Sequence, residues 1–308
     1  MKQTILGSNG QIAEELAREL RKKYTTDLRL VSRKPKQING DDELFAANLL
    51  DAQKTSEAVA GSAIVYLTVG LPMDTAMMEE QFPVMMQHVI AACKQHQAKL
   101  VFFDNTYMYA QNNIPQTEES AFEPVGRKGR VRAQVAQLLL NEINAKTLEA
   151  VICRAPEFYG PGKTQSITNT TIFEALKQHK KLRVFINDNV LRTLIWTPDA
   201  SKATALIGNT ASAYNQTWHL PCDDNRLTYK QFIEQVGLVY NKKITYTVLP
   251  KWLLILGGLF NSRAKEIQEL LPRYATDNIF DSTKFKANFP QFRVTTYAEG
   301  IRLIAEEN

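Results

Sequence analysis

The chain of 308 residues is 44% hydrophobic and 22% charged, which is typical of a globular protein with a large buried core and excludes a disordered or fibrous chain. Its 37 basic and 32 acidic side chains give a net charge of +5 that is spread along the sequence, so no nucleic-acid partner is expected. Three widely separated cysteines argue against a disulfide framework and against a metal site, and favour free thiols.

Neither a leader nor a membrane span is expected from the sequence. The first strand is expected almost at Met1, which leaves no room for a secretory signal and predicts a cytoplasmic protein. The most apolar run, Trp252 to Phe260, has nine residues, whereas roughly 18 are needed to cross a bilayer. This run is interpreted as a buried helix, and no membrane partner is expected.

A short apolar run, a glycine turn and an amphipathic helix follow one another in residues 3–20. Such a turn directs backbone N–H groups and the positive end of a helix at a phosphate, and its glycines lack the Cβ atoms that would hold the phosphate away. The Gly-x-x-Gly-x-x-Ala spacing departs from G-x-G-x-x-G, but a second strand after one helix is typical of dinucleotide folds. The expected cofactor contacts in this turn are Gly7, Ser8, Asn9, Gly10, Gln11 and Ile12.

Apolar strands alternate with helical segments through the first half of the chain. Strands are expected at 3–6, 28–32, 44–48, 63–68, 99–103 and 149–154, and helices at 10–23, 51–60, 74–97 and 128–146. This alternation predicts an α/β fold, a Rossmann-type doubly wound parallel sheet with helices on both faces.

The second expected strand ends in Ser32, Arg33 and Lys34, where NAD-specific folds usually carry an acidic residue for the ribose 2′-OH. An acid would repel a 2′-phosphate, whereas these three residues would bind one. NADP is therefore the expected cofactor, with NAD as the alternative. The other interpretation of the segment is a solvated basic loop.

Two further strand ends are expected to contact the cofactor. Asn48 and Leu49, after the third strand, are placed to flank an adenine. Thr68, Val69 and Gly70, after the fourth strand, would let the backbone approach the pyrophosphate.

The helix expected at 74–97 carries four methionines on one face, at spacings of seven and eight residues. They are Met77, Met78, Met85 and Met86. Packing, within the core or between subunits, is the favoured interpretation, and a methionine-lined substrate pocket is the alternative.

Five segments in chain order resemble the motifs of one known family. They are GSNGQIA at 7–13, KLVFFDNTYMYA at 99–110, RAPEFYGPG at 154–162, LIWTPDASKA at 194–203 and QTWHLP at 216–221. The family has a glycine turn, a strand ending in Ser-Ser-x-x-Val-Tyr-Gly, a run Arg-Pro-x-Asn-Val-Tyr-Gly-Pro-Gly, a segment Phe-Ile-x-Val-Asp-Asp-x-Ala and a following strand. The chain thus resembles an extended short-chain dehydrogenase/reductase, the superfamily of NAD-dependent epimerases and dehydratases.

The resemblance implies a division into two parts. Residues 1–159 and 188–222 would form the Rossmann dinucleotide-binding domain, and residues 160–187 and 223–308 a smaller substrate lobe. It also places Pro156 and Phe158 among the cofactor contacts. Family members commonly dimerise through the helices expected here at 74–97 and 128–146, so a homodimer is expected unless the clustered basic residues of the second helix repel each other.

The catalytic centre departs from the family, whose members use Tyr-x-x-x-Lys on the long helix. Alignment puts Val125 or Gly129 at the tyrosine position, Gly129 or Ala133 at the lysine position, and Asn105 at the upstream serine. The chain therefore resembles the atypical branch, which keeps the fold but has lost or rearranged these residues.

Asn105, Tyr107, Lys128 and Arg132 are the candidate catalytic residues. Residues two apart near a strand end point the same way, so Tyr107 would share the pocket side with Asn105 and deliver a proton to the substrate oxygen. Lys128 and Arg132, four apart on one helix face, would be the cations that make this tyrosine acidic, or else a solvated face. The alternative for Tyr107 is packing under the nicotinamide.

Two functions remain open. One is an NADP(H)-dependent oxidoreductase that acts on a small carbonyl or sugar-type substrate through a non-standard active site. The other is a non-catalytic NADP(H)-binding sensor. Tyr159 and His219 are interpreted as packed or hydrogen-bonded residues.

Overall fold

A computed structural model describes residues 1–162, 164 and 166–307, and the chain forms two compact units. The first unit comprises Met1–Met108, Arg127–Ala155 and Ala200–Leu220. The second comprises Tyr109–Gly126, Pro156–Asp199 and Pro221–Asn308. Residues 109–126, 156–159, 188–199 and 221–222, which the sequence resemblance placed with the sheet, group with the second unit.

The first unit is built on a seven-stranded parallel sheet of order β11-β6-β5-β4-β1-β2-β3. The strands are β1 (Gln3–Leu6), β2 (Leu28–Ser32), β3 (Glu43–Ala46), β4 (Ile64–Leu67), β5 (Lys99–Asp104), β6 (Ala150–Arg154) and β11 (Gln216–His219). From β1, the sheet is extended first by β2 and β3 on one side and then by β4, β5 and β6 on the other side. The direction in which strands are added therefore reverses between β1 and β4. In open sheets of this kind, ligands bind at the carboxyl ends of the strands beside that reversal.

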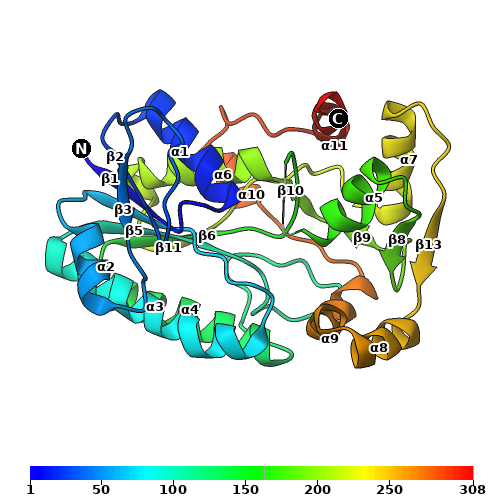
Figure 1. The fold of residues 1–308 in the computed structure, drawn as a ribbon, viewed down its shortest axis with the longest axis horizontal. Helices are drawn as coiled ribbons and strands as arrows, with labels where there is room; N and C mark the ends of the chain where they lie inside the picture. The colour runs from blue at the N-terminus through cyan, green and yellow to red at the C-terminus, as the bar shows by residue number, and fades with distance from the viewer. Residues whose placement is uncertain (163, 165, 308) are drawn as a thin grey trace. The chain divides into compact units, whose positions relative to one another are not determined.

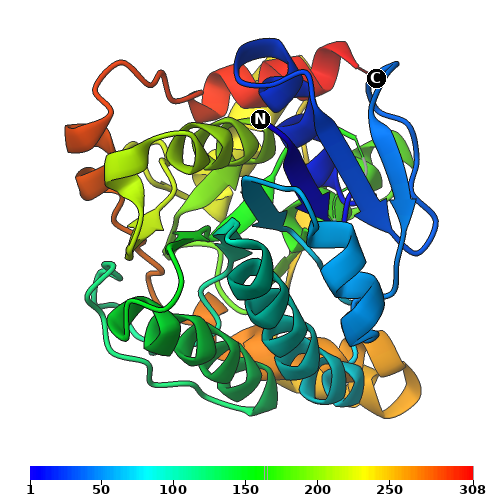
Figure 2. The same cartoon turned by 90° about the vertical axis from the view of Figure 1, so that its left-hand side faces the viewer.

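Helices cover both faces of the sheet, as expected (Figures 1 and 2). They are α1 (Gln11–Lys23), α2 (Ala52–Val59), α3 (Thr75–His96), α4 (Arg127–Asn144) and α6 (Thr197–Gly208). Helices α2, α3 and α4 lie on one face, and α1 and α6 lie on the other. The buried residues of α1 include Ala13, Leu16, Ala17 and Leu20, a spacing that presents one apolar side to the sheet. The Rossmann-type fold is confirmed.

The methionine face of α3 belongs to the core of the first unit. Met78, Met85 and Met86 are buried, and the space beside the last two, against Phe82 and Val135 of α4, is a cavity of only about 10 Å³. A cavity of that size holds at most one water molecule. Packing within the core therefore accounts for these three methionines, and this cavity is too small to hold a substrate. A homodimer through α3 stays a prediction.

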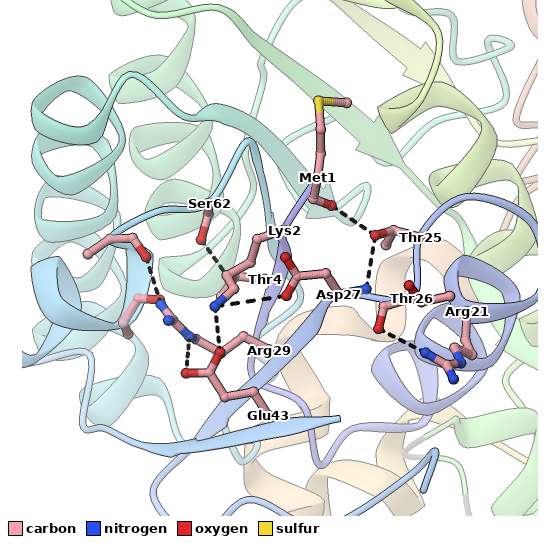
Figure 3. Close-up of polar contacts among 12 residues, drawn as sticks. Met1, Lys2, Thr4, Arg21, Thr25, Thr26, Asp27, Arg29, Glu43 and Ser62 are labelled. Atoms are coloured by element: carbon pink, nitrogen blue, oxygen red, sulfur yellow. Dashed lines mark hydrogen bonds and ion pairs between the residues drawn. The ribbon is translucent and has the colours of Figure 1, made fainter. Parts of the chain in front are cut away.

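A network of hydrogen bonds and ion pairs joins the amino ends of β1, β2 and β3 (Figure 3). Glu43 accepts hydrogen bonds from Lys2 at 2.7 Å and from Arg29 Nε at 2.9 Å. Arg29 Nη1 also donates to the carbonyl oxygens of Ala58 and Ala60, at 2.8 and 2.9 Å. Lys2, Arg29 and Glu43 are thus paired within the protein.

Among its described residues, the second unit contains three short strand pairs and several helices. Parallel pairs join β7 (Glu157–Tyr159) to β10 (Leu194–Trp196) and β8 (Leu182–Phe185) to β13 (Tyr246–Leu249), and an antiparallel pair joins β9 (Leu191–Arg192) to β12 (Leu227–Thr228). The helices include α5 (Glu174–Lys177), α7 (Tyr229–Val239), α8 (Lys251–Phe260), α9 (Ser262–Ile267), α10 (Thr283–Asn288) and α11 (Tyr297–Glu306). A short π-helix (Asn169–Phe173) and a 3₁₀-helix (Gln268–Tyr274) also belong to this unit.

Aromatic side chains form the core of the second unit. The Tyr159 ring lies 5.2 Å from that of Trp196 and 5.7 Å from that of Phe232, and burial raises the pKa of Tyr159 well above its usual value. Tyr159 is therefore a packed residue, as expected.

A buried ion pair accompanies this core. Arg192 Nη2 lies 2.9 Å from Glu157, which also accepts hydrogen bonds from Tyr229 and Tyr274. Burial acts to raise the pKa of Glu157, but the Arg192 charge and the hydrogen bonds from Thr168 and Arg192 outweigh it and hold this pKa below its usual value.

Helix α8 differs from the expectation of a buried helix. It is helical, but Trp252 is 62%, Leu259 75% and Phe260 87% exposed. The sequence predicted a buried helix because apolar residues are usually buried. In α8, however, the buried residue is Gly258 and the large apolar side chains are exposed or half-buried. Within the described residues, the structure has no helix of the length and hydropathy that a membrane span requires.

All three cysteines are buried free thiols. Burial raises the pKa of Cys93 to about 12 and also raises the pKa values of Cys153 and Cys222. Among the residues that the structure describes, no cluster of side chains could hold a metal ion.

Candidate functional site

The glycine turn lies between β1 and α1, at the carboxyl edge of the sheet. Gly7 has a φ of +93°, and a Cβ at this position would lie 2.8 Å from the Val69 side chain and 2.9 Å from its backbone. Only glycine therefore allows β1 and the end of β4 to approach this closely. The N–H groups of Gly7 and Ser8 both donate to the Val31 carbonyl, at 2.9 and 3.0 Å, which fixes the turn against β2.

Gly10 is the N-cap of α1, and no side chain caps this helix end. A Cβ on Gly10 would meet only the Gly7 carbonyl oxygen, at 3.6 Å, so the protein itself does not require glycine here. The Ser8 hydroxyl is buried and has no hydrogen-bond partner among the residues that the structure describes. Open space over a glycine, uncapped N–H groups and an unsatisfied hydroxyl fit the oxygens of a phosphate group.

The basic loop after β2 is joined to the glycine turn. Asn9 Nδ2 donates to the Lys34 carbonyl oxygen at 2.8 Å, and the Lys34 N–H donates to the Ser32 hydroxyl at 3.2 Å. The side chains of Arg33 and Lys34 are exposed. The structure thus brings together the two segments that were predicted to hold the phosphates of a dinucleotide.

The ends of β3 and β4 lie at the same edge. Thr68 Oγ1 donates to the Leu6 carbonyl at 3.1 Å, which ties the end of β4 to β1, and a Cβ on Gly70 would meet no atom within 4 Å. Asn48 is exposed and its side chain accepts from the Leu50 N–H at 3.2 Å, whereas Leu49 is buried. Pro156 and Phe158 belong to the second unit.

Asn105 and Tyr107 lie in a turn, because β5 ends at Asp104. The Asn105 side-chain oxygen accepts a hydrogen bond from the Tyr107 N–H at 3.0 Å, which is the geometry of an Asx turn. Strand alternation, from which both side chains were predicted to share one side, therefore does not apply to these two residues. That they share the pocket side stays a prediction.

Arg132 is part of a buried ion-pair group in the first unit. Its guanidinium donates to Asp104, which also lies 3.3 Å from Arg154 Nε. It stacks on two aromatic rings, 4.8 Å from the Phe82 centroid and 5.4 Å from the Phe102 centroid. The suggestion of a solvated helix face is therefore wrong for Arg132.

Lys128 is also buried, at 1% exposure, and its ammonium group donates to the Thr75 hydroxyl at 2.6 Å. It lies one turn before Arg132 on the same side of α4, so the predicted pairing on one face is correct but that face points into the protein. Asp104 and Thr75, the partners of these cations, were not among the predicted site residues. A carboxylate at the end of an otherwise apolar strand is a signal that could have found Asp104, because a buried charge requires a partner.

The comparison with protein families gives a match that covers more than half of the chain. The model of the NAD dependent epimerase/dehydratase family matches residues 4–218, which contain the glycine turn, the basic loop and the β5 and β6 strand ends. The chain belongs to this family. The match begins within β1 and ends within β11, so it spans the first unit and part of the second.

Several solved structures share the fold of this chain. The chain superposes on UDP-glucose 4-epimerase of Thermus thermophilus, crystallised with NAD, with a TM-score of 0.78 and 15% identity over 99% of this chain and 98% of that one. For UDP-glucuronic acid 4-epimerase of Bacillus cereus, crystallised with UDP-glucuronic acid and NAD, the TM-score is 0.80 and the identity 14%, over 100% and 99%. At this identity the similarity shows the fold.

One sequence relative is the "Uncharacterized protein y4nL" of Sinorhizobium fredii (strain NBRC 101917 / NGR234). It is 29% identical over 135 residues, which are 44% of this chain and 37% of the relative. The matched segment thus spans little more than a third of that relative's length.

Proposed function

We propose that this chain binds NADP(H) at the carboxyl edge of β1, β2 and β4 and acts as an oxidoreductase on a small carbonyl or sugar-type substrate. The observation that carries the proposal is the hydrogen bond from Asn9 to Lys34, which holds the glycine turn and the basic loop together as one anion-binding edge. The family is described as NAD dependent, and two structural neighbours were crystallised with NAD.

Each segment of the edge has a role in this proposal. The N–H groups at the start of α1, beside Gly7 and Gly10, bind the diphosphate, and Ser8 satisfies its buried hydroxyl on a phosphate oxygen. Arg33 and Lys34 bind the ribose 2′-phosphate through charge-assisted hydrogen bonds. The bound cofactor would supply or accept the hydride.

The chain itself must supply a proton to the substrate oxygen, since the family's Tyr-x-x-x-Lys pair is missing. Tyr107 is the proposed donor, because it is half-buried immediately after β5, at the edge where the cofactor would bind. Asn105 holds the turn that positions it, through the bond to its N–H. The buried cations Lys128 and Arg132 contribute positive charge at the same end of the unit, beyond what Asp104 neutralises.

Titration with NADPH and NADH tests the cofactor proposal. Charge-assisted bonds are worth roughly 1.5–3 kcal/mol each, so NADPH should bind at least about tenfold more tightly than NADH. Arg33→Asp should reverse that order, because the carboxylate repels the 2′-phosphate and accepts from the 2′-OH. Lys36→Asp is the matched control, an exposed lysine of the same loop. Equal affinities, or an NADH preference in the unmodified protein, would refute the NADP proposal.

A non-catalytic sensor is the second candidate function. This candidate is favoured because Lys128 donates to Thr75 and Arg132 forms an ion pair with Asp104. Cations that are paired within the protein do not point at a substrate. Tight NADPH binding together with a failure of every carbonyl compound in a broad screen to oxidise NADPH would support the sensor over the enzyme.

A further inference from the structure

Helix α8 (Lys251–Phe260) presents a continuous apolar face to solvent in the second unit. The exposed large side chains recur at spacings of three, four and seven residues, so they share one side of the helix. They are Trp252, Leu253, Ile255, Leu256, Leu259 and Phe260, from 42% to 87% exposed. Single exposed apolar residues are ordinary, but a face of six on one short helix marks an interaction site.

The orientation of α8 is fixed by its small residues. Gly258 is buried, and a Cβ at this position would clash with the side-chain amide of Gln268. That amide also donates to the carbonyl oxygen of Ile255 at 3.0 Å and of Leu254 at 3.3 Å. Helices α8 and α9 lie side by side in both views (Figures 1 and 2). The glycine side therefore packs inward, and the large apolar side chains point away.

An amphiphilic hollow of about 430 Å³ opens between α8 and α9. Ile255, Leu259 and Phe260 form its apolar wall, and Ser262 and Lys265 lie on its polar side. A hollow that combines hydrocarbon with an ammonium group suits an anionic amphiphile, whose acyl chain and headgroup have these two properties.

Charge indicates which surface covers the α8 face. Lys251 at the start of α8 and Lys265 beside the hollow are exposed, whereas the nearby acids Glu266 and Glu269 are half-buried. Two copies of this face would bring together two surfaces that carry the same exposed lysines, on chains that each have a net charge of +5. An anionic lipid surface instead complements the lysines and accepts the apolar side chains, and tryptophan is favoured at such interfaces.

We propose that the apolar face of α8 lies in the surface of an anionic lipid bilayer and holds the protein there. The sequence predicted no membrane partner because this apolar run is too short for a helix that crosses a bilayer. That length requirement does not apply to a helix that lies along the bilayer surface. The proposal is independent of the proposed oxidoreductase function.

Sedimentation of the full chain with vesicles tests this. We expect it to bind vesicles of phosphatidylcholine mixed with phosphatidylglycerol more tightly than vesicles of phosphatidylcholine alone. Leu259→Asp with Phe260→Asp should weaken binding at least tenfold, and Lys251→Glu with Lys265→Glu should remove the preference for the anionic vesicles. Leu238→Asp is the matched control, because Leu238 is an 81% exposed apolar residue of α7 and its loss should leave binding unchanged.

Tryptophan fluorescence gives a second readout. Trp196 and Trp218 are buried and Trp252 is exposed, so a blue shift on addition of anionic vesicles would report Trp252 entering the bilayer. Absence of binding to both kinds of vesicle, or equal binding by the α8 variant and the unmodified protein, would overturn the proposal. So would a dimer seen by light scattering that the α8 variant dissociates.

Discussion

The Asx turn after β5 gives Tyr107 a position that does not depend on strand geometry. The Asn105 side chain accepts from the Tyr107 N–H, so the amide side chain and the tyrosine are held by one local hydrogen bond. If Asn105 only positions Tyr107, replacing Asn105 changes where the Tyr107 phenol lies but not the ability of the phenol to donate a proton. The two residues therefore have separable roles in the proposed reaction.

Tyr107→Phe tests the proton donor. With a carbonyl substrate in hand, we expect turnover to fall by a factor on the order of 10² or more, because general acid catalysis contributes roughly that much. NADPH affinity should be unchanged, since the hydroxyl is not needed for nucleotide binding. Tyr24→Phe is the control, a half-buried tyrosine at the far end of α1. Unchanged turnover in Tyr107→Phe would remove this residue from the mechanism.

At the residue scale, the sequence predicted the placement of the candidate cofactor-binding residues better than that of the candidate catalytic residues. Gly7, Asn9 and Lys34 lie together because a strand, a turn and a helix fix local geometry. The burial of Arg132 could not be predicted, because its partner Asp104 is 28 residues away and helical spacing does not show which way a polar face points.

At the scale of elements, the network of Figure 3 joins the amino ends of β1, β2 and β3. Partial burial acts to raise the pKa of Glu43, but the hydrogen bonds from Lys2 and Arg29 outweigh it, so the pKa is lowered. A lowered pKa in the folded state stabilises the fold above the unfolded-state pKa. That stabilisation is lost as the pH falls through the folded-state value.

Glu43→Gln should therefore reduce the free energy of unfolding at neutral pH but not in acid. Because Glu43 is 41% exposed, we expect a loss of about 1 kcal/mol or less. The difference from the unmodified protein should shrink as the pH falls below about 4.3, the ordinary pKa of a glutamate, and disappear below the lowered folded-state pKa, where the carboxyl is protonated in both states. Urea unfolding at neutral pH and in acid measures it, with Glu80→Gln, an exposed carboxylate of α3, as control. A difference that persists in acid would show a role other than charge.

Most of the elements could be predicted because each apolar run has the length and period of a strand or helix. The end of β5 was expected at residue 103 and lies at Asp104, and α4 begins at Arg127 rather than at 128. What could not be predicted is which face of an apolar helix has a partner. The run in α8 contains too many apolar residues to show a polar side, so only its packing against Gln268 shows which side is open.

For the whole molecule, the homodimer expected through α3 and α4 would rest largely on polar contacts. Many apolar side chains of these helices are buried and others, such as Met77 and Leu138, are half-buried, whereas the exposed positions carry polar residues such as Glu80, Gln87, Arg130 and Gln134. Contacts of this kind are screened by salt.

We therefore predict that any self-association through these helices is weak and is lost at high ionic strength. Light scattering over a range of protein and salt concentrations measures the mass. Arg130→Glu should change the association at low salt, and Leu259→Asp should not. A dimer that persists at high salt would contradict this and would point to an apolar interface elsewhere.

Because the three thiols are divided between the two units, the rate at which each thiol is alkylated can report how often its unit opens. Cys93 and Cys153 lie in the first unit and Cys222 in the second, and burial keeps all three protonated while the chain is folded. An alkylating reagent should therefore modify each thiol only when its own unit opens. Added NADPH should slow the modification of Cys93 and Cys153 more than that of Cys222, as mass spectrometry of the labelled peptides would show. Equal protection of all three would mean that the two units unfold as one cooperative body.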